Sequence, residues 1–312
     1  MKRRKLATAV LLGGLAACTA PRTPHPPAFE LPGRINVRAA GRIVSVPLDE
    51  YVLGSVLAEV SPVDESGRSV ARIFEVQSVI ARSYAVAHRG RHRREGFDVC
   101  DSIHCQLYDP GRIKTSRFSA AARDAVRQTS GQVLMYAQRP AEALFHADCG
   151  GSTAAADAVW GGPAVPYLRP ARDDQPSLSH RTWRVAIPTA RLRDALNRDR
   201  RSRVGRRLDN IAIVTRDASG RAATVAVRGE QDRVIRGEDL RAIVNRALGE
   251  RTLQSTKVTI GRAGDSFVFT GAGFGHGVGL CQIGAAARAR RGESVNDILE
   301  AYFNGATLSR TK

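Results

Sequence analysis

One histidine near the C-terminal end of this 312-residue chain stands in an unusual setting. The segment GAGFGHGVGLCQIGAAARAR, residues 271–290, has glycine at every second position from Gly271 to Gly279, with His276 among them and Cys281 directly after them. A period of two is typical of an extended chain, and alternate glycines leave one of its faces bare. We expect that bare face to let a ligand or another backbone approach closely.

The glycine spacing also excludes several familiar sites. A dinucleotide fingerprint needs glycines at i, i+2 and i+5, and a phosphate-binding Walker loop ends in Gly-Lys-Ser/Thr; the segment has neither. The chain contains no His-Glu-x-x-His and no Gly-x-Ser-x-Gly motif. A glycine-rich hairpin around a packed histidine and a hydrolase built on Cys281 and His276 remain alternatives.

Two other segments combine cysteine with histidine. Their candidate metal ligands are Cys100, His104, Cys105, His146 and Cys149. Such mixed sets suit tetrahedral zinc. Cys100 and Cys105 are close enough in sequence to form a local disulfide instead, which export from the cytoplasm favours. Free thiols are the third alternative.

Two predicted helices contain further polar candidates. DEYVLGSVLAEV (residues 49–60) has apolar residues at helical spacing and ends near Glu59. RSVARIFEVQSVIARSYAVAHRG (residues 68–90) predicts a longer helix, and Gln77 falls on its apolar stripe. Because a buried amide needs hydrogen-bond partners, Gln77 is either a structural hydrogen-bonding residue or part of a buried polar site.

The rest of the chain alternates between helical and strand patterns. Residues 35–48 predict a hairpin or two short strands, 116–128 a helix, and 131–137 and 142–147 two strands. From about residue 181 to 270 the pattern is richer in strands, with helices expected at 189–200 and 237–250. Helices at 280–291 and 295–303 close the chain, which indicates a mixed α+β fold.

The N-terminus resembles an export signal. Four cations at residues 2–5 precede an apolar run, residues 6–17, that is too short for a stable transmembrane helix. Leu15-Ala16-Ala17-Cys18 is similar to a bacterial lipobox, which predicts cleavage before Cys18 and its acylation. An ordinary signal peptide is the alternative. Residues 19–34 are proline-rich and predict a semi-rigid spacer.

The chain is strongly basic, with 48 Lys and Arg against 30 Asp and Glu and a formal net charge of +18. A basic surface favours an anionic partner. For an exported protein this partner is cell-wall glycan or lipid headgroups and not nucleic acid. A general arginine richness of the proteome is an alternative explanation for part of the excess.

At this point a family resemblance is evident. GFGHGVGLCQIGAAARA (273–289) is similar to the C-terminal signature of the SpoIID/LytB family, which contains stage II sporulation protein D lytic transglycosylases and amidase enhancers. LAEV with FEVQSVIARSYAV, DVCDSIHCQLYD, FHADCGGSTAAADAVWGG with PYL, and GEDLRAIV agree with it in the same order. The resemblance covers about residues 35–305.

The resemblance implies a catalytic role for Glu59, which matches the glutamate of the family's Ala-Glu-Met-Pro segment. Here Val60-Ser61 replaces Met-Pro, and Pro62 follows one position later. A lytic transglycosylase needs only one carboxyl group. That group protonates the leaving glycosidic oxygen and then accepts the proton of the muramic 6-hydroxyl, which requires a pKa raised by an apolar pocket.

The same resemblance implies substrate-binding or site-supporting roles for further residues. These are Gln77, Arg82, Tyr84, His276 and Gln282. We expect His276 to orient the substrate or the site and not to act as the general acid. The bare glycine face would then admit a sugar polymer or the Glu59 helix. No cofactor is required, although some members of the family carry zinc near the site.

The sequence therefore predicts a membrane-anchored, extracytoplasmic lipoprotein that acts on peptidoglycan glycan strands. A non-catalytic, peptidoglycan-binding enhancer of a cell-wall amidase is the alternative, and a purely structural wall-binding lipoprotein is a third. We expect a groove between a helical catalytic part and a β-rich subdomain. The predicted organisation is a signal peptide (1–17), a linker (18–34) and a SpoIID/LytB domain (35–305), divided into 35–175, 180–270 and 271–305.

Overall fold

The computed structural model of the chain describes residues 29–63, 65, 67–173 and 180–311. The predicted signal peptide, the lipidation residue Cys18 and most of the proline-rich linker lie outside these residues. Within the described residues, no helix is both long and apolar enough to cross a membrane.

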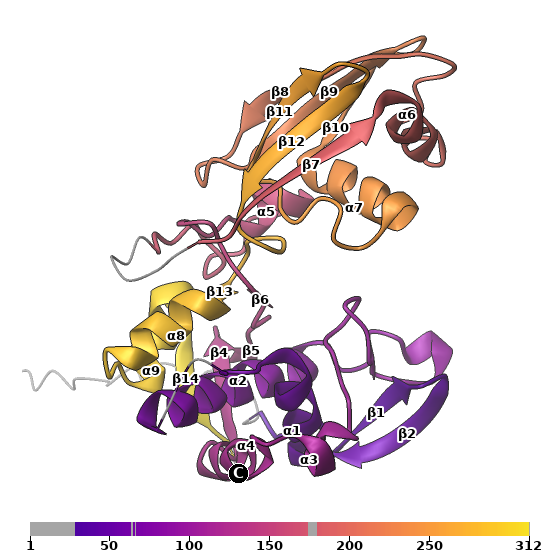
Figure 1. Cartoon of the computed structure of the whole chain (residues 1–312). Coiled ribbons are helices and arrows are strands. Elements are labelled where there is room, and N and C mark those ends of the chain that lie inside the picture. The colour runs from indigo at the N-terminus through magenta and orange to yellow at the C-terminus, as the bar shows by residue number, and fades with distance from the viewer. Residues whose placement is uncertain (1–28, 64, 66, 174–179, 312) are drawn as a thin grey trace, which may run out of the picture.

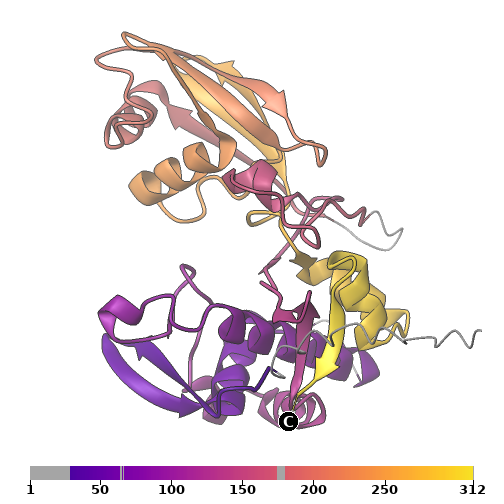
Figure 2. The ribbon, with the colours of Figure 1, turned by 180° about the vertical axis from the view of Figure 1, so that it is seen from behind.

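The chain forms two lobes joined by a narrow waist (Figure 1; Figure 2). The lower lobe contains the N-terminal half and the C-terminal helices, and the upper lobe contains the strand-rich middle of the chain. The chain crosses the waist twice, through β6 (Phe145–His146) and β13 (Leu280–Cys281), which pair in parallel. This mixed architecture confirms the predicted α+β class; the groove between the parts stays a prediction.

The lower lobe is built around the long helix α2 (Gly67–Ala87). One face of α2 packs with α1 in an N-terminal core, and the opposite face packs with α8 and α9 in a second core. The helix is buried on two sides because its apolar positions extend beyond a single stripe. The other helices here are α1 (Leu48–Glu59), α3 (Arg112–Thr115), α4 (Ser119–Gln128), α8 (Gln282–Arg290) and α9 (Val295–Tyr302), with the 3-10 turn η1 (Arg93–Glu95).

Two small sheets complete this lobe. One has the order β2-β1-β3, and the other has the order β14-β4-β5, which brings the C-terminal strand beside the middle of the lobe. Their strands are β1 (Arg34–Ala39), β2 (Arg42–Pro47), β3 (Val99–Cys100), β4 (Gln132–Tyr136), β5 (Arg139–Pro140) and β14 (Thr307–Arg310). The predicted hairpin at 35–48 is confirmed as β1 and β2.

The upper lobe has a core of its own, made only of residues between Trp183 and Phe269. Two antiparallel sheets, β10-β9-β8 and β11-β12-β7, share it with α6 and α7. The elements are β7 (Thr182–Pro188), α6 (Thr189–Asn197), β8 (Leu208–Arg216), β9 (Ala222–Gly229), β10 (Arg233–Arg236), α7 (Gly237–Leu248), β11 (Val258–Ala263) and β12 (Ser266–Ala272), and α5 (Ala156–Trp160) lies at the base of the lobe.

The glycine segment differs from the extended strand that its spacing predicts. β12 ends at Ala272, and the glycines that follow all have positive φ: Gly273 (81°), Gly275 (108°), Gly277 (85°) and Gly279 (72°). A side chain at any of them would overlap the neighbouring chain between Leu144 and Gly150 or the guanidinium of Arg221. Glycine is therefore required by backbone conformation and by close packing at the waist. The predicted approach of a sugar polymer or of the Glu59 helix to this face is wrong, because these protein groups occupy it.

Candidate functional site

Glu59 is the last residue of α1. The helix ends there because Val60 is extended (φ −126°, ψ 131°) and Pro62, two positions on, disfavours a helical Ser61. Val60 packs against both cores of the lower lobe, so the carboxyl group lies beside their junction. The following turn is held to α8 by an ion pair of 2.6 Å between Glu65 and Arg290.

The surroundings of Glu59 favour its protonated form. Its Oε1 accepts one hydrogen bond, from the backbone N–H of Leu107 at 2.7 Å. No ion pair with a cation is formed by Glu59 within the described chain. Burial raises the pKa of Glu59 to about 7, and the Leu107 hydrogen bond lowers it only in part. The carboxyl group can therefore both donate and accept a proton near neutral pH.

The loop that carries Leu107 also gathers cysteine and histidine side chains. His92, Cys100, His104 and Cys105, here called the loop cluster, place their ligand atoms within 4.8 Å of one another. Nε2 of His92 lies 3.4 Å from Sγ of Cys105, and Nδ1 of the same ring is bound by Glu95 at 2.6 Å. Nδ1 of His104 lies 3.7 Å from both sulfurs. Two thiols and two imidazoles, with a carboxylate orienting one ring, form a donor set that fits tetrahedral zinc.

The structure does not join Cys100 and Cys105, and a disulfide between them stays one of the three alternatives. Both are free thiols, as are Cys149 and Cys281. Each sulfur of the loop instead faces a histidine nitrogen.

Gln77 and Gln282 meet at the interface between α2 and α8. Nε2 of Gln282 donates to Oε1 of Gln77 at 3.4 Å. Gln77 is 2% exposed, and its Nε2 is buried without a hydrogen-bond partner. The predicted burial of this amide is confirmed, and its unpaired N–H group leaves one unused donor beside the glycine-rich signature.

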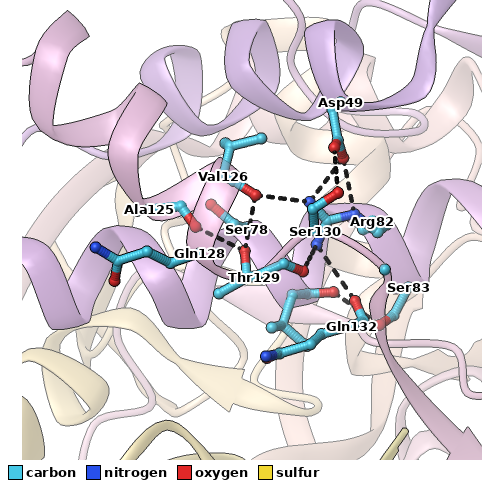
Figure 3. A network of polar contacts seen from close by, with 12 residues as sticks. Asp49, Ser78, Arg82, Ser83, Ala125, Val126, Gln128, Thr129, Ser130 and Gln132 are labelled. Carbon is cyan, nitrogen blue, oxygen red and sulfur yellow. Dashed lines mark hydrogen bonds and ion pairs between the residues drawn. The ribbon is translucent and has the colours of Figure 1, made fainter. Parts of the chain in front are cut away.

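Arg82 is fully buried in the lower lobe, and Figure 3 shows its polar contacts. Its guanidinium donates to Oδ1 of Asp49 at 2.8 Å and to the carbonyl groups of Thr129 at 2.9 Å and Gln132 at 3.2 Å. Ser130 donates to the other oxygen of Asp49. Arg82 connects α1, α2 and the turn after α4; of the two predicted roles, its burial fits support of the site and not direct substrate contact.

Tyr84 is also buried, and its ring stacks on His88 with the centroids 4.1 Å apart. The hydroxyl accepts a hydrogen bond from Arg91 at 3.3 Å. Burial raises the pKa of Tyr84, so the phenol stays protonated. Its position matches a supporting role as well.

His276 is half-buried at the waist, between the rings of Trp160 and His146. Its Nδ1 accepts a hydrogen bond from the backbone N–H of Val278 at 3.1 Å, which places the ring proton on Nε2. Desolvation, with the positive charges of Arg241 and Arg221, lowers the pKa of His276 to about 3. A neutral imidazole with this tautomer can donate a hydrogen bond, but it is not a general acid at neutral pH.

The other predicted ligands, His146 and Cys149, lie apart from the loop cluster. They join Cys281 at the waist, and the ligand atoms of the three residues lie within 4.8 Å of one another. We call these three residues the waist cluster. The predicted metal ligands thus separate into two sets, one beside the hydrogen-bond partner of Glu59 and one where the lobes meet.

Glu59 and His276 share no hydrogen bond or ion pair in the described part of the chain. Helix α2 connects their surroundings, because it packs on α1 along one face and on α8 along the other. The structure therefore brings the predicted site residues together in separate pairs and clusters and not in a single site.

Three groups escape sequence reasoning. His92 lies eight residues before Cys100, and the pattern of His, Cys and His-Cys at short spacing is a signal that could have revealed it. The Leu107 N–H group has no signal, because a backbone donor depends only on loop geometry. Trp160 belongs to the family-like Val-Trp-Gly-Gly segment; the residue is 39% exposed, and its ring centroid lies 5.1 Å from that of His276.

Comparison with known proteins defines the class of the molecule. Residues 37–136 match the family described as "Stage II sporulation protein" (SpoIID), and residues 174–279 match a domain of unknown function (DUF8618). Stage II sporulation protein D of Bacillus amyloliquefaciens is 30% identical over 86% of this chain and 75% of its own length. The protein of the same name from Bacillus subtilis is 28% identical over 86% of this chain and 76% of its own.

The chain therefore belongs to the stage II sporulation protein D (SpoIID/LytB) family. It is also similar to the amidase enhancer of Bacillus subtilis, with 24% identity over 76% of this chain and 38% of that protein. These relatives carry the names of the two groups of proteins, stage II sporulation protein D and amidase enhancer, in the family that the sequence resembles.

Proposed function

We propose that the protein is an extracytoplasmic lytic transglycosylase that cleaves the MurNAc–GlcNAc bonds of peptidoglycan glycan strands. The observation that carries the proposal is the environment of Glu59. A half-buried carboxyl group with one backbone hydrogen bond, no cationic partner and a pKa of about 7 suits a group that must act as acid and then as base. Anchoring to the membrane through an acylated Cys18 belongs to the same proposal.

The proposed reaction uses this one carboxyl group twice. Protonated Glu59 gives its proton to the glycosidic oxygen as the bond from that oxygen to C1 of the muramic sugar breaks. The 6-hydroxyl of the same sugar then bonds to C1 while its proton passes to the Glu59 carboxylate. The products are a 1,6-anhydro-muramyl end and a free GlcNAc hydroxyl, and Glu59 regains its proton. A second carboxylate is unnecessary because no water is activated.

We further propose that the loop cluster holds a structural zinc ion through His92, Cys100, His104 and Cys105. The donor set fits, and Glu95 orients the His92 ring. The role of these residues is to fix the loop in which Leu107, two positions after Cys105, donates to Glu59. A closed set of four protein ligands supplies folding energy and not reaction chemistry.

Trp160 is the proposed contact for the glycan near the waist. Its ring is accessible, while Arg236 Nη1 donates to its carbonyl group at 2.7 Å and Arg241 lies close enough to His276 to affect its charge. An exposed indole beside basic groups offers a stacking face for sugar rings and attraction for their carboxylates.

The test is product analysis on purified glycan strands with the mature chain and its Glu59→Gln variant. We expect the native chain alone to release anhydro-muramyl ends and the variant to release none, with unchanged circular dichroism. Glu300→Gln, an exposed carboxyl on α9, is the matched control and should keep full activity. Retained activity of Glu59→Gln would remove the proposal.

The second candidate function is a non-catalytic enhancer of a cell-wall amidase, which the similarity to the Bacillus subtilis amidase enhancer favours. It predicts no anhydro ends from the protein alone. It also predicts faster amidase action on peptidoglycan when the protein is added, with Glu59→Gln as effective as the native chain. The two candidates therefore differ in the same set of assays.

A further inference from the structure

The waist cluster is the most deeply buried group of reactive side chains in the described chain that the proposed reaction does not use. Cys149 and Cys281 are 0% exposed, and His146 is 4% exposed. The three come from two crossing segments, since β6 carries His146, β13 carries Cys281, and these two residues are register partners. Cys149 follows β6 by three positions.

The His146 ring offers a free lone pair at this point. Its Nδ1 lies 3.1 Å from the carbonyl oxygen of Val278, which can only accept, so Nδ1 carries the proton. The other nitrogen, Nε2, is therefore an acceptor, and it is buried without any hydrogen-bond partner. An imidazole held through Nδ1–H by a backbone carbonyl, with its Nε2 lone pair unused, is the usual arrangement of a metal-binding histidine.

Both sulfurs accept backbone hydrogen bonds, which a metal-bound thiolate can keep. The backbone N–H of Cys149 donates to Sγ of Cys281 at 3.2 Å, and the N–H of Gly151 donates to Sγ of Cys149 at 3.3 Å. Cys281 is the N-cap of α8, so the positive end of a nine-residue helix adjoins its sulfur. The buried guanidinium of Arg221 bonds the Cys149 carbonyl at 2.8 Å, while its Nε and Nη1 have no partner.

We infer that the waist cluster is a second metal site, which binds a zinc ion through Nε2 of His146 and the sulfurs of Cys149 and Cys281. Binding releases the two thiol protons to solvent, and the two thiolates neutralise the charge of the ion. Three protein ligands leave a fourth position for water or for a carboxylate. Asp173 is the neighbouring carboxylate, since its Oδ2 lies 3.7 Å from Sγ of Cys149 and its Oδ1 is buried without a partner.

A disulfide between the same cysteines is the competing outcome. A disulfide would leave Nε2 of His146 buried without a hydrogen-bond partner, which is costly. It would also leave unexplained why both sulfurs accept hydrogen bonds from backbone N–H groups. The adjacent group of Asp148, Cys149 and His180 does not compete for the metal, because the two ring nitrogens of His180 already contact Asp148 (2.7 Å) and the Asp173 carbonyl (3.3 Å).

The consequence concerns the joint between the lobes. β6 and β13 pair over only two residues, and the segments beside them are joined by backbone hydrogen bonds from the N–H of Leu280 to the Leu144 carbonyl (2.9 Å) and from the N–H of Ile283 to the Ala147 carbonyl (3.2 Å). A metal ion bridging both segments would fix the point where the chain enters and leaves the upper lobe. Its contribution is to stability of the waist, independent of the reaction at Glu59.

The experiment is zinc analysis of the full mature chain and two matched variants. Cys105→Ser disables the loop cluster, and Cys281→Ser disables the waist cluster with an equally small change. We expect Cys105→Ser to retain zinc, and Cys281→Ser to carry one zinc ion fewer than the native chain. Loss of all zinc from Cys105→Ser, or an unchanged zinc content in Cys281→Ser, would overturn the inference.

A second measurement does not depend on the folding of Cys281→Ser. The Cys105→Ser chain, whose waist cluster is intact, is reconstituted with cobalt(II), and we expect sulfur-to-cobalt charge-transfer absorption. In a parallel sample the protein is denatured without a reducing agent and treated with a chelator to remove metal. Thiol labelling should then find free thiols at Cys149 and Cys281. A Cys149–Cys281 disulfide peptide in its digest, or no charge-transfer band, would refute the site.

Discussion

The end of α1 carries Glu59 and the glycine segment carries His276, and burial shifts the pKa values of these two side chains in opposite directions. At the end of α1, Glu59 is desolvated and receives one neutral N–H donor, so its pKa rises to about 7. In the glycine segment, His276 is desolvated close to Arg221 and Arg241, so its pKa falls to about 3.

The difference teaches how burial selects a role. Desolvation favours the neutral form of both groups. The carboxyl group of Glu59 therefore still carries a proton that it can donate near pH 7, whereas the imidazole of His276 stays neutral and only forms hydrogen bonds. A neutral carboxylic acid still holds a transferable proton, whereas this imidazole has its proton on Nε2 and its Nδ1 occupied by Val278. The general acid is therefore expected on α1 and not among the glycines.

The largest effect on catalysis should appear when Glu59 and His276 are each replaced by glutamine in separate variants. We expect Glu59→Gln to lower kcat/KM by roughly 10²–10⁴-fold, the usual contribution of a general acid. His276→Gln keeps a hydrogen-bonding group and should lower it by less than about 10-fold. Steady-state release of anhydro ends measures both, and equal losses would erase the distinction between the two regions.

The next effect concerns the free energy of unfolding and the hydrogen-bond network of Arg82, which holds α1 through Asp49. Arg82→Met removes the buried partner of Asp49 and three carbonyl contacts, which should lower the free energy of unfolding by about 3 kcal/mol. Arg127→Met, in an exposed ion pair with Asp124, is the control and should cost below about 1 kcal/mol. Chemical denaturation measures both, and a small loss for Arg82→Met would mean that this network does not hold α1.

The raised pKa of Glu59 should also appear as a pH-dependent stability. Because the folded pKa of about 7 exceeds the usual value of 4.5, ionisation costs nothing well below pH 4.5, destabilises the fold increasingly between pH 4.5 and 7, and adds no further loss above pH 7. Glu59→Gln removes this cost. The variant should be more stable than the native chain by about 3 kcal/mol at pH 8 and equally stable near pH 4.

Urea unfolding at the two pH values measures this difference. Glu300→Gln, on the exposed face of α9, serves again as the control. A Glu59→Gln stabilisation that is the same at both pH values would contradict the desolvation of this carboxyl group.

The requirement for glycine in this segment is tested by adding one methyl group at a single position and measuring the free energy of unfolding. Gly277→Ala adds a Cβ against the Arg221 guanidinium at a φ of 85°, which we expect to cost about 2–3 kcal/mol of unfolding free energy. Gly292→Ala has nearly the same φ, 81°, and no atom within 4 Å of the new Cβ, so about 1 kcal/mol is expected. Similar losses in both would show that conformation alone, without close packing, requires glycine at the waist.

The smallest effect is expected for glycan binding at Trp160. Trp160→Ala should weaken the affinity for isolated glycan strands by about 1 kcal/mol, roughly fivefold, through loss of the aromatic face. Val214→Ala changes a side chain that is 56% exposed on the upper lobe and should not affect binding. Sedimentation with insoluble peptidoglycan measures both affinities, and equal binding by all three proteins would exclude Trp160 as a contact.

The sequence by itself determined the main elements and the family. Apolar spacing located α1, α2, α4, α6, α7, α8 and α9 and most of the longer strands, because amphipathic periodicity is a local property. The burial of Gln77 could be predicted because this polar residue falls within an apolar stripe. The motifs with Glu59 and the glycine-rich signature identified the SpoIID/LytB resemblance, which the relatives confirm.

Only the tertiary structure decided the state and the neighbours of these residues. The raised pKa of Glu59 depends on packing and on a donor 48 positions away, and the division of the cysteines and histidines into two clusters depends on which loops meet. The alternate glycines look like a flat strand when read locally. Their positive φ values arise because residues 144–150 and Arg221 press against them from elsewhere in the chain, and no local pattern encodes that contact.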